Sequence, residues 1–367
     1  MERYIFTSES VTSGHPDKIC DAIADSFLDE ALRQDKNSKM AVEVTIKDDL
    51  IFVYGECNTK ANIDYEKIAK DYLKEIGYEE NYEVLIKVGE QSSEINHAVV
   101  KEDEIGAGDQ GIMFGYACKD TLEYMPAPIQ YANKLAKRLE EVQKKTDYLR
   151  PDGKTQVSVE YVDGEVARID TIVISTQHTL DASYKEIVNL LLKEVILKVI
   201  PLNLLDENTK FLINPSGSFV VGGSFGDSGT TGRKIICDTY GGMGRIGGGC
   251  FSSKDPSKVD RSAAYYCRYV AKSIVANDLA DKCEIQVSYA IGKEEPISIF
   301  IETFGTEKVS KDEIYDVINN NFSFKVKDMI QELELKNPIY KKTATYGHFG
   351  REEFPWEKVK VLENEKK

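Results

Sequence analysis

Residues 214–260 read NPSGSFVVGGSFGDSGTTGRKIICDTYGGMGRIGGGCFSSKDPSKVD, and this run holds 12 of the chain's 26 glycines. Glycine loses more backbone freedom on folding than any other residue, so such a cluster weakens a fold unless the backbone must approach a ligand closely. Basic side chains lie among the glycines, although the chain carries a formal net charge of -15. They are Arg233, Lys234, Arg245, Lys254 and Lys258. Backbone N–H groups together with cations predict a site for a polyanion, and phosphate is the usual one.

Four aspartates lie in the same run and supply the oxygen ligands that a hard cation prefers. They are Asp227, Asp238, Asp255 and Asp260. A metal ion that bridges phosphate groups would need such ligands. The alternative is a glycine-rich surface loop with ordinary charges, because loops collect glycine for their own turns.

The composition indicates a globular protein in a reducing compartment. A chain of 367 residues predicts two or three domains. The sequence pI near 5.0 argues against nucleic-acid or anionic-membrane partners, which need a basic face. The seven cysteines form no CxxC pair, so neither a zinc site nor a disulfide framework is indicated. Because no signal peptide and no apolar run of about 20 residues is present, we expect a cytoplasmic protein.

The first predicted helix begins near Pro16 and continues to about Arg33. Proline is favoured in the first turn, where its missing N–H is not needed, and apolar residues then recur at helical spacing. His15 and Asp17 therefore lie at a helix N-terminus, where anions are readily bound. Alternatively, His15 only caps the helix and Asp17 only interacts with its dipole. The pattern alone leaves both interpretations open.

Paired strands alternate with helices along the chain. Residues 40–46 alternate between apolar and polar side chains, and with residues 50–56 they predict an antiparallel hairpin. The Asp163-Gly164 turn is the strongest signal for a second hairpin. Mixed sheets with helices on one face predict an α+β fold. On this pattern, Glu43 and Glu56 of the first hairpin are ordinary exposed carboxylates.

Residues 89–110 are polar, acidic and without periodicity. A connection of this length inside a compact protein is usually a lid or a binding loop. The segment leads into GAGDQG, in which the glycines around Asp109 predict a hinge. We therefore expect residues 89–110 to form an active-site lid. Further along, Ser183 and Glu186 predict a capping box before a helix over residues 187–200.

Two familiar nucleotide-binding patterns are nearly matched. Residues 242–247 satisfy G-x-G-x-x-G after a strand-like segment at 233–240, but a Rossmann fold needs a helix at once and an acidic residue about 20 positions on. Neither follows here. Gly153-Lys154-Thr155 resembles the end of a P-loop, but Tyr148 replaces its first glycine. Neither pattern identifies the site.

Several motifs together resemble those of the S-adenosylmethionine synthetase family, the methionine adenosyltransferases, in their bacterial form. The segments are GHPDK (14–18), GAGDQG (106–111), GGMGRIGGG (241–249) and KDPSKVDRSA (254–263). Others, among them INPSG, GRKIICDTYGG and YGHFGRE, follow in the family's order. The resemblance extends from Phe6 to about Trp356. Each motif alone is weak, but the set is very specific.

The resemblance implies an activity and an architecture. The methionine sulfur would attack C5′ of ATP to give S-adenosylmethionine, and the released tripolyphosphate would be hydrolysed to phosphate and pyrophosphate. Two magnesium ions per site and one potassium ion per subunit are implied. So are three domains of similar topology, over residues 2–92, 104–219 and 221–357. The subunits would form a homo-oligomer, commonly a dimer of dimers, with active sites shared between subunits.

The resemblance also assigns residues by position. The expected ATP contacts are His15, Asp152, Lys154, Ser218, Phe219, Asp227, Arg233, Lys234, Cys250 and Lys254. Among them, the expected catalytic residues are His15, Lys154, Arg233 and Lys254. The expected methionine contacts are Glu56, Gln91, Asp109, Asp227 and Lys258. Asp17 and Asp260 match magnesium ligands, and Glu43 matches a potassium ligand.

The chain departs from the usual bacterial pattern at a few of these positions. Ser218 replaces a frequent arginine, and Ile246 replaces a frequent histidine. Cys250 and Ser253 replace small residues beside the site. These differences concern individual contacts and not the family.

The implied chemistry fits the residue types. A thioether sulfur is neutral and carries no proton, so its attack needs no general base. A departing tripolyphosphate gains negative charge, which fixed cations stabilise. The competing hypothesis is a regulatory protein that binds a nucleotide without turnover. Phosphate release that depends on methionine would distinguish the two.

Overall fold

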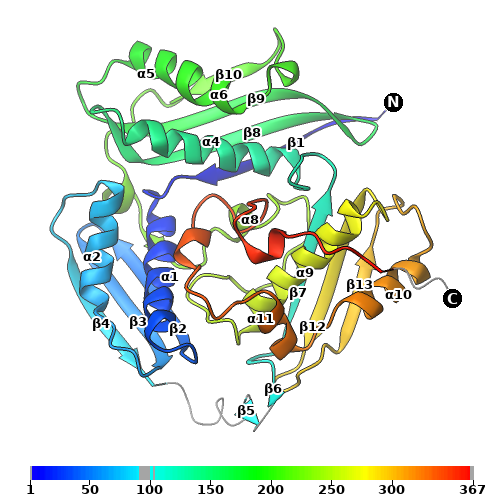
Figure 1. Cartoon of the computed structure of the whole chain (residues 1–367). Helices are drawn as coiled ribbons and strands as arrows, with labels where there is room; N and C mark the ends of the chain where they lie inside the picture. The colour runs from blue at the N-terminus through cyan, green and yellow to red at the C-terminus, as the bar shows by residue number, and fades with distance from the viewer. Residues whose placement is uncertain (1, 91–99, 102–103, 364–367) are drawn as a thin grey trace.

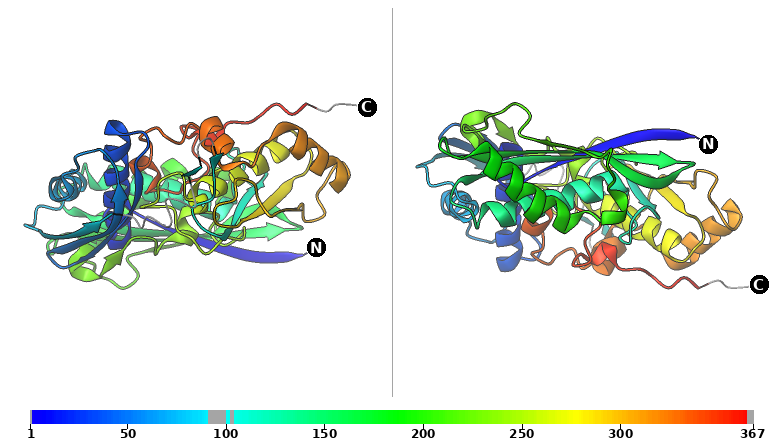
Figure 2. Two further views of the ribbon diagram at one scale, coloured as in Figure 1. Left: turned by 90° about the horizontal axis from the view of Figure 1, so that it is seen from below. Right: turned by 90° about the horizontal axis from the view of Figure 1, so that it is seen from above.

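The computed structural model describes residues 2–90, 100–101 and 104–363 (Figure 1). Its main helices and strands form three units, each with a sheet covered on one face by helices (Figure 1, Figure 2). The predicted α+β fold is therefore confirmed.

The first sheet has the strand order β11-β2-β3-β4, with β2 (Lys39–Lys47), β3 (Leu50–Asn58), β4 (Glu83–Gly89) and β11 (Gly229–Thr230). The first two form the predicted antiparallel hairpin, and alternate residues of β2 are buried. β4 is parallel to β3. The helices α1 (Pro16–Gln34) and α2 (Tyr65–Ile76) pack on this sheet. Gly77 ends α2 in the left-handed conformation, as its position predicts.

The second sheet has the order β1-β8-β9-β10, with β1 (Arg3–Val11), β8 (Leu149–Val162), β9 (Glu165–His178) and β10 (Lys210–Ile213). β8 and β9 form the hairpin predicted by Asp163-Gly164, and both turn residues have positive φ, as a tight hairpin turn requires. β10 is parallel to β9. The helix α4 (Ala127–Gln143) packs on β1 and β8.

The third sheet has the order β13-β12-β7, with β7 (Gly111–Cys118), β12 (Lys282–Tyr289) and β13 (Ser298–Glu302). All its strands pair antiparallel. The helix α9 (Val259–Ala276) packs on β7 and β12, and the helices α10 (Lys311–Asn321) and α11 (Val326–Glu332) follow. A separate short pair joins β5 (Val100–Lys101) to β6 (Glu104–Ile105).

Each main sheet takes one edge strand from another part of the chain. β1 comes from the N-terminal segment and pairs with β8, and β7 from the central segment pairs with β12. β11 from the C-terminal segment closes the cycle by pairing with β2. The segment boundaries predicted at 2–92, 104–219 and 221–357 are not tested by this arrangement. The sheets nevertheless cross those boundaries, so no unit is made by one segment alone.

The buried apolar residues that the structure describes form two hydrophobic clusters. One is shared by the first and third units and extends from Ile19 to Trp356, and the other fills the second unit. Met243 packs against both. None of the described helices has the combination of length and apolar character that a membrane crossing requires. All seven cysteines are free.

The helix expected over 187–200 is present, with α5 (Tyr184–Leu191) continuing through a π-helical turn (Leu192–Ile196) into the short α6 (Leu197–Val199). Two local predictions are wrong. The expected capping box is absent, because Ser183 makes no side-chain cap. The strand-like segment at 233–240 forms a short helix, α8 (Ile235–Asp238). Among the described residues this segment belongs to no sheet: β11 ends at Thr230, and α8 packs beside β1. Propensity is overridden there by tertiary context.

Candidate active site

The N-terminus of α1 places the first two predicted site residues. Nδ1 of His15 accepts a hydrogen bond from the backbone N–H of Asp17 at 3.1 Å, so His15 is the N-cap. Because Nδ1 accepts, neutral His15 carries its proton on Nε2. Burial is the main cause that lowers the pKa of His15 to about 3, and the charge of Lys234 adds to it. His15 is thus a neutral hydrogen-bond donor at neutral pH.

Asp17 gathers groups from the glycine-rich run. Its Oδ1 accepts the N–H of Thr230 at 3.0 Å, and its Oδ2 lies 2.5 Å from Nζ of Lys234. Arg233 approaches Oδ1 to 3.6 Å. Burial disfavours the ionised carboxylate, but the bonds from Lys234 and Thr230 outweigh it and lower the pKa of Asp17. We call these four residues the Asp17 cluster.

Lys154 and Asp152 lie on β8 beside this cluster. The register places Lys154 opposite the last residue of β1, and therefore near the start of α1. Oδ2 of Asp152 accepts the N–H of Gly223 at 2.8 Å. Burial raises the pKa of Asp152 to about 6, against the effects of this bond and of the Lys154 charge. The charge of Lys154 also contributes to the lowered pKa of His15, after burial and Lys234.

A second cluster surrounds Asp260 in the first turn of α9. Nζ of Lys254 lies 2.7 Å from Oδ2 of Asp260. The backbone of Lys254 pairs with Ala41 of β2, and Glu43 follows two residues later. The hydroxyl of Ser253 donates to Oε1 of Glu43 at 3.4 Å, and burial raises the pKa of Glu43. Lys254, Asp260, Glu43 and Ser253 form the Asp260 cluster.

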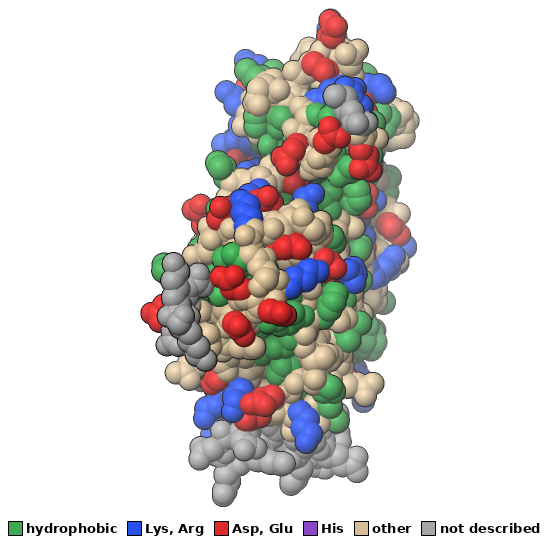
Figure 3. Space-filling model, turned by 90° about the vertical axis from the view of Figure 1, so that its right-hand side faces the viewer, with side chains coloured by type: hydrophobic (Ala, Val, Ile, Leu, Met, Phe, Trp, Pro, Cys, Tyr) green, Lys and Arg blue, Asp and Glu red, His purple; other side chains and the backbone are tan. Residues whose placement is uncertain are grey.

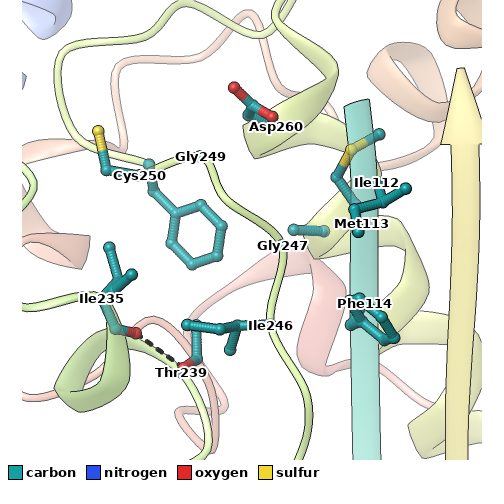
Figure 4. Close-up of a pocket in the computed structure, with 12 residues that line it drawn as sticks. Ile112, Met113, Phe114, Ile235, Thr239, Ile246, Gly247, Gly249, Cys250 and Asp260 are labelled. Atoms are coloured by element: carbon teal, nitrogen blue, oxygen red, sulfur yellow. Dashed lines mark hydrogen bonds between the residues drawn. The ribbon is translucent and has the colours of Figure 1, made fainter. Parts of the chain in front are cut away.

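A small, mainly apolar pocket opens beside Asp260 (Figure 4). The carboxylate lies at one side of it, and Ile235, Ile246 and Phe114 lie at the other (Figure 4). Cys250 is also in its wall. The pocket therefore joins Asp260 to the segment that follows Lys234.

The two clusters are adjacent. A methyl group placed on Gly232 would lie 2.7 Å from Sγ of Cys250, so the segment of Arg233 and Lys234 contacts the segment of Lys254. Asp17 and Asp260 also have corresponding positions, because each lies in the first turn of the first long helix of its segment. α4, the corresponding helix of the central segment, has no acidic residue in its first turn.

Other predicted residues lie outside the two clusters. Glu56 is exposed on β3, and its charge contributes to the raised pKa of Glu43, after burial. Asp227 is exposed near Asp152, where its charge acts on that carboxyl. Asp109 is also exposed. Lys258 is held in an ion pair by the buried Asp255.

Phe219, the residue expected to stack on adenine, lies beside the end of β9. Phe219 exchanges two hydrogen bonds with His178: its N–H donates to Nε2 at 3.0 Å, and its carbonyl accepts the His178 N–H at 2.9 Å. Ser218 beside it is exposed. Gln91 lies outside the described residues, as do residues 91–99 and 102–103 of the predicted lid.

Three further aspartates of α1 were missed by the sequence reasoning. Asp17, Asp21, Asp25 and Asp29 recur at every fourth residue, so they share one face of the helix. All four are buried, and each accepts at least one backbone N–H from the C-terminal part of the chain. We call this face the aspartate ladder. The sequence feature that could have revealed the ladder was the four-residue spacing of aspartates in a helix predicted to have an apolar face.

Models of known protein families match this sequence along nearly the whole chain. Three domain models of S-adenosylmethionine synthetase match in order: the N-terminal domain at residues 3–100, the central domain at 104–219 and the C-terminal domain at 221–358.

Full-length relatives match equally well. An S-adenosylmethionine synthase of Clostridium tetani is 51% identical over 384 residues, which cover 98% of each chain. That of Brachyspira hyodysenteriae is 50% identical, with 98% of this chain and 97% of the relative covered. That of Sorangium cellulosum is 50% identical, with 98% and 88% covered. The chain therefore belongs to the S-adenosylmethionine synthetase family, the methionine adenosyltransferases.

Proposed function

We propose that this chain makes S-adenosylmethionine by direct attack of the methionine sulfur on C5′ of ATP at the two clusters. Tripolyphosphate would leave and then be hydrolysed to phosphate and pyrophosphate. The observation that carries the proposal is the convergence of Arg233, Lys234 and Lys254 on carboxylates at two adjacent helix N-termini. Cations so placed can hold a long polyanion.

The catalytic task is to stabilise the leaving group. The sulfur is neutral, so no group has to remove a proton from it. His15 would donate from Nε2 to the oxygen that departs from C5′, and its low pKa keeps it a neutral donor. Lys154, Arg233 and Lys254 would hold the phosphates in line and oppose the growing charge. Fixed charges of this kind need no reorganisation during the reaction.

The donor set suits magnesium bound together with phosphate. Magnesium is usually held by one or two carboxylates, waters and substrate phosphates, and no cage made only of protein is needed. Among the described residues, no group of three or more His, Cys, Asp or Glu side chains is placed to hold a metal ion. Asp17 and Asp260 would each hold one ion, which would spread the charge of the triphosphate. Glu43 would hold potassium.

Ion pairs offer a reason for joint binding of metal and nucleotide. Asp17 is paired with Lys234, and Asp260 with Lys254. If magnesium alone bound the two carboxylates, the lysines would lose their ion-pair partners. If phosphate alone bound the two lysines, the carboxylates would lose theirs. The metal–nucleotide complex supplies partners to both. This argument supports the assignment of both aspartates.

The remaining contacts are assigned by the family pattern. The adenine would stack on Phe219, beside Ser218, and Asp152, Asp227 and Cys250 would complete the ATP site. Methionine would lie near Glu56, Gln91, Asp109, Asp227 and Lys258. A lid over 89–110 and a cytoplasmic location also stay predictions.

We also propose a homo-oligomer, a dimer of dimers with shared active sites. The support lies on the sheet faces that the helices leave uncovered. By strand alternation, the exposed apolar residues Ile5, Leu85, Ile112 and Phe300 lie on those faces. Figure 3, seen from the side of the third sheet, shows hydrophobic side chains gathered between acidic and basic ones. Apolar area of this kind marks interfaces.

The decisive experiment measures phosphate release with ATP, methionine, magnesium and potassium. We expect release only when methionine is present, whereas a regulator would bind ATP without it. His15→Ala or Lys154→Ala should slow adenosyl transfer by about 10²–10³ at saturating ATP. The exposed Lys145 provides the control, Lys145→Ala, which should stay near the wild-type rate. Near-normal turnover in either site variant at saturating ATP would contradict the proposed roles.

A further inference from the structure

The aspartate ladder joins α1 to the segments that carry the site cations. Asp21 accepts the N–H of Gly232 at 2.8 Å, and Gly232 directly precedes Arg233. Asp25 accepts the N–H of Ser253 at 3.1 Å, and Ser253 directly precedes Lys254. Both aspartates are completely buried. The middle of the ladder therefore holds the backbone immediately before Arg233 and immediately before Lys254.

Lys18 fixes the other end of the Arg233–Lys234 segment. Its Nζ donates to Oδ2 of Asp21 at 2.9 Å and also to Oδ1 of Asp238, and its side chain has no exposure. Asp238 ends α8, which begins directly after Lys234. Arg233 and Lys234 thus lie between two points that are tied to α1 through Asp21.

Lys254 is held in a similar way. Arg261 of α9 donates to both oxygens of Asp25 at 2.8 Å and to the carbonyl of Lys254 at 3.0 Å. Both charged side chains are fully buried. Asp29, at the end of the ladder, differs: it accepts the N–H groups of Tyr340 and Lys341, away from the cations.

Fold stability alone is a weak reason for such groups. A buried ion pair loses so much hydration that apolar residues of the same volume often stabilise a fold as well or better. Binding of a polyanion, by contrast, depends strongly on where the cations stand, and a displacement of about 1 Å can cost about 10²-fold in rate. Flexible side chains need a fixed backbone to achieve this placement.

We propose that Asp21 with Lys18, and Asp25 with Arg261, are positioning residues that hold Arg233, Lys234 and Lys254 where a triphosphate chain binds. The proposal rests on the function proposed above, in which these cations contact the triphosphate. Asp21 and Lys18 are fully buried and would act through this backbone, without contacting the substrate. Asp29 serves only to attach the C-terminal segment.

Asp21→Asn gives the test, and Asp29→Asn is its matched control on the same helix face. Asp21→Asn is preferable to Asp25→Asn, which would leave the buried Arg261 without a counter-charge, whereas Lys18 keeps Asp238. The full-length variants are compared for affinity toward inorganic tripolyphosphate by calorimetry, for stability in urea, and for kcat and both KM values. Asp238→Asn, at the other end of the Lys18 bridge, is the second variant if Asp21→Asn does not fold.

We expect Asp21→Asn to weaken tripolyphosphate binding by about 10–100-fold and to lower kcat, with little change in the KM for methionine. Asp29→Asn should lose stability but keep its tripolyphosphate affinity within about twofold. Equal affinities in wild type and Asp21→Asn, or equal losses in both asparagine variants, would overturn the proposal.

Lys234→Met separates this inference from the proposed function. If Lys234→Met also leaves tripolyphosphate affinity unchanged, the cations do not bind the phosphates and the proposed function fails. If Lys234→Met weakens binding and Asp21→Asn does not, only the positioning role fails. If both weaken binding, the double variant should lose less than the sum of the two losses, because Asp21 would act through the Lys234 segment.

Discussion

His348 shows how burial of a single side chain sets a pH limit for the fold. Its Nδ1 lies 2.7 Å from the Tyr265 hydroxyl, and its Nε2 lies 3.8 Å from Oδ1 of Asp238. The ring has no exposure. Burial, and then the charges of Arg261 and Lys18, lower its pKa well below the usual value of about 6.5. His348 is therefore neutral in the folded protein.

We predict that His348 costs stability as the pH falls. Below about pH 6.5 the His348 side chain takes up a proton in the unfolded chain but not in the folded chain, so protonation stabilises the unfolded state. The free energy of unfolding is therefore unaffected by His348 above that pH and decreases as the pH falls below it. The loss is at most about 1.4 kcal/mol per pH unit. Urea unfolding of wild type and His348→Asn between pH 7 and pH 5 would measure it. The wild type should lose more stability than the variant, and parallel pH profiles would contradict the prediction.

At the scale of the element, only some positions in the glycine-rich run require glycine. A methyl group on Gly249 would lie 2.2 Å from Cγ of Asp260, whereas one on Gly248 would meet nothing within 4 Å. Neither residue is among the glycines with positive φ, so alanine is allowed by the backbone at both. The difference between the two positions is therefore purely one of contact with the Asp260 carboxylate.

Gly249→Ala should displace that carboxylate or the loop. We expect adenosyl transfer to fall by about 10²-fold, since a shift of about 1 Å at a site has such effects. Gly248→Ala should keep near wild-type activity. Methionine-dependent phosphate release by the two purified variants provides the measurement. Equal activity in both would mean that the run does not position Asp260.

Some of the helices and strands could be predicted from the sequence, and others could not. The apolar spacing of α1 and the hairpin alternation were sufficient, because both depend on local periodicity. The capping box at Ser183 was wrong, although its sequence signal was present, since no side-chain bond forms. The acidic face of α1 was missed because a search for apolar periodicity treats aspartates as solvent-facing. Their partners, Gly232 and Ser253, are more than 200 residues away in sequence.

At the scale of the molecule, the exchange of strands could not be predicted from the chain. The family resemblance implied three domains of similar topology, and the α+β fold class is confirmed. Which strand pairs with which depends on contacts over long separations, such as those of Arg3 with Val162 and Gly229 with Ile46. Nothing in a strand's own pattern records its partner. The cluster residues are brought together by this exchange, because β1 leads into α1 and β11 leads into Arg233.

The exchange predicts how the whole molecule unfolds. Each sheet loses an edge strand when another segment unfolds, and two of the units also share one core. The three segments should therefore unfold together, in one transition seen equally by calorimetry, far-UV circular dichroism and tyrosine fluorescence. Separate transitions for the segments would contradict the role of the exchanged strands.

If the exposed apolar faces are interfaces of an oligomer, the midpoint of unfolding should also rise with protein concentration, because association stabilises only the folded chains. A midpoint that does not change with concentration would contradict the oligomer.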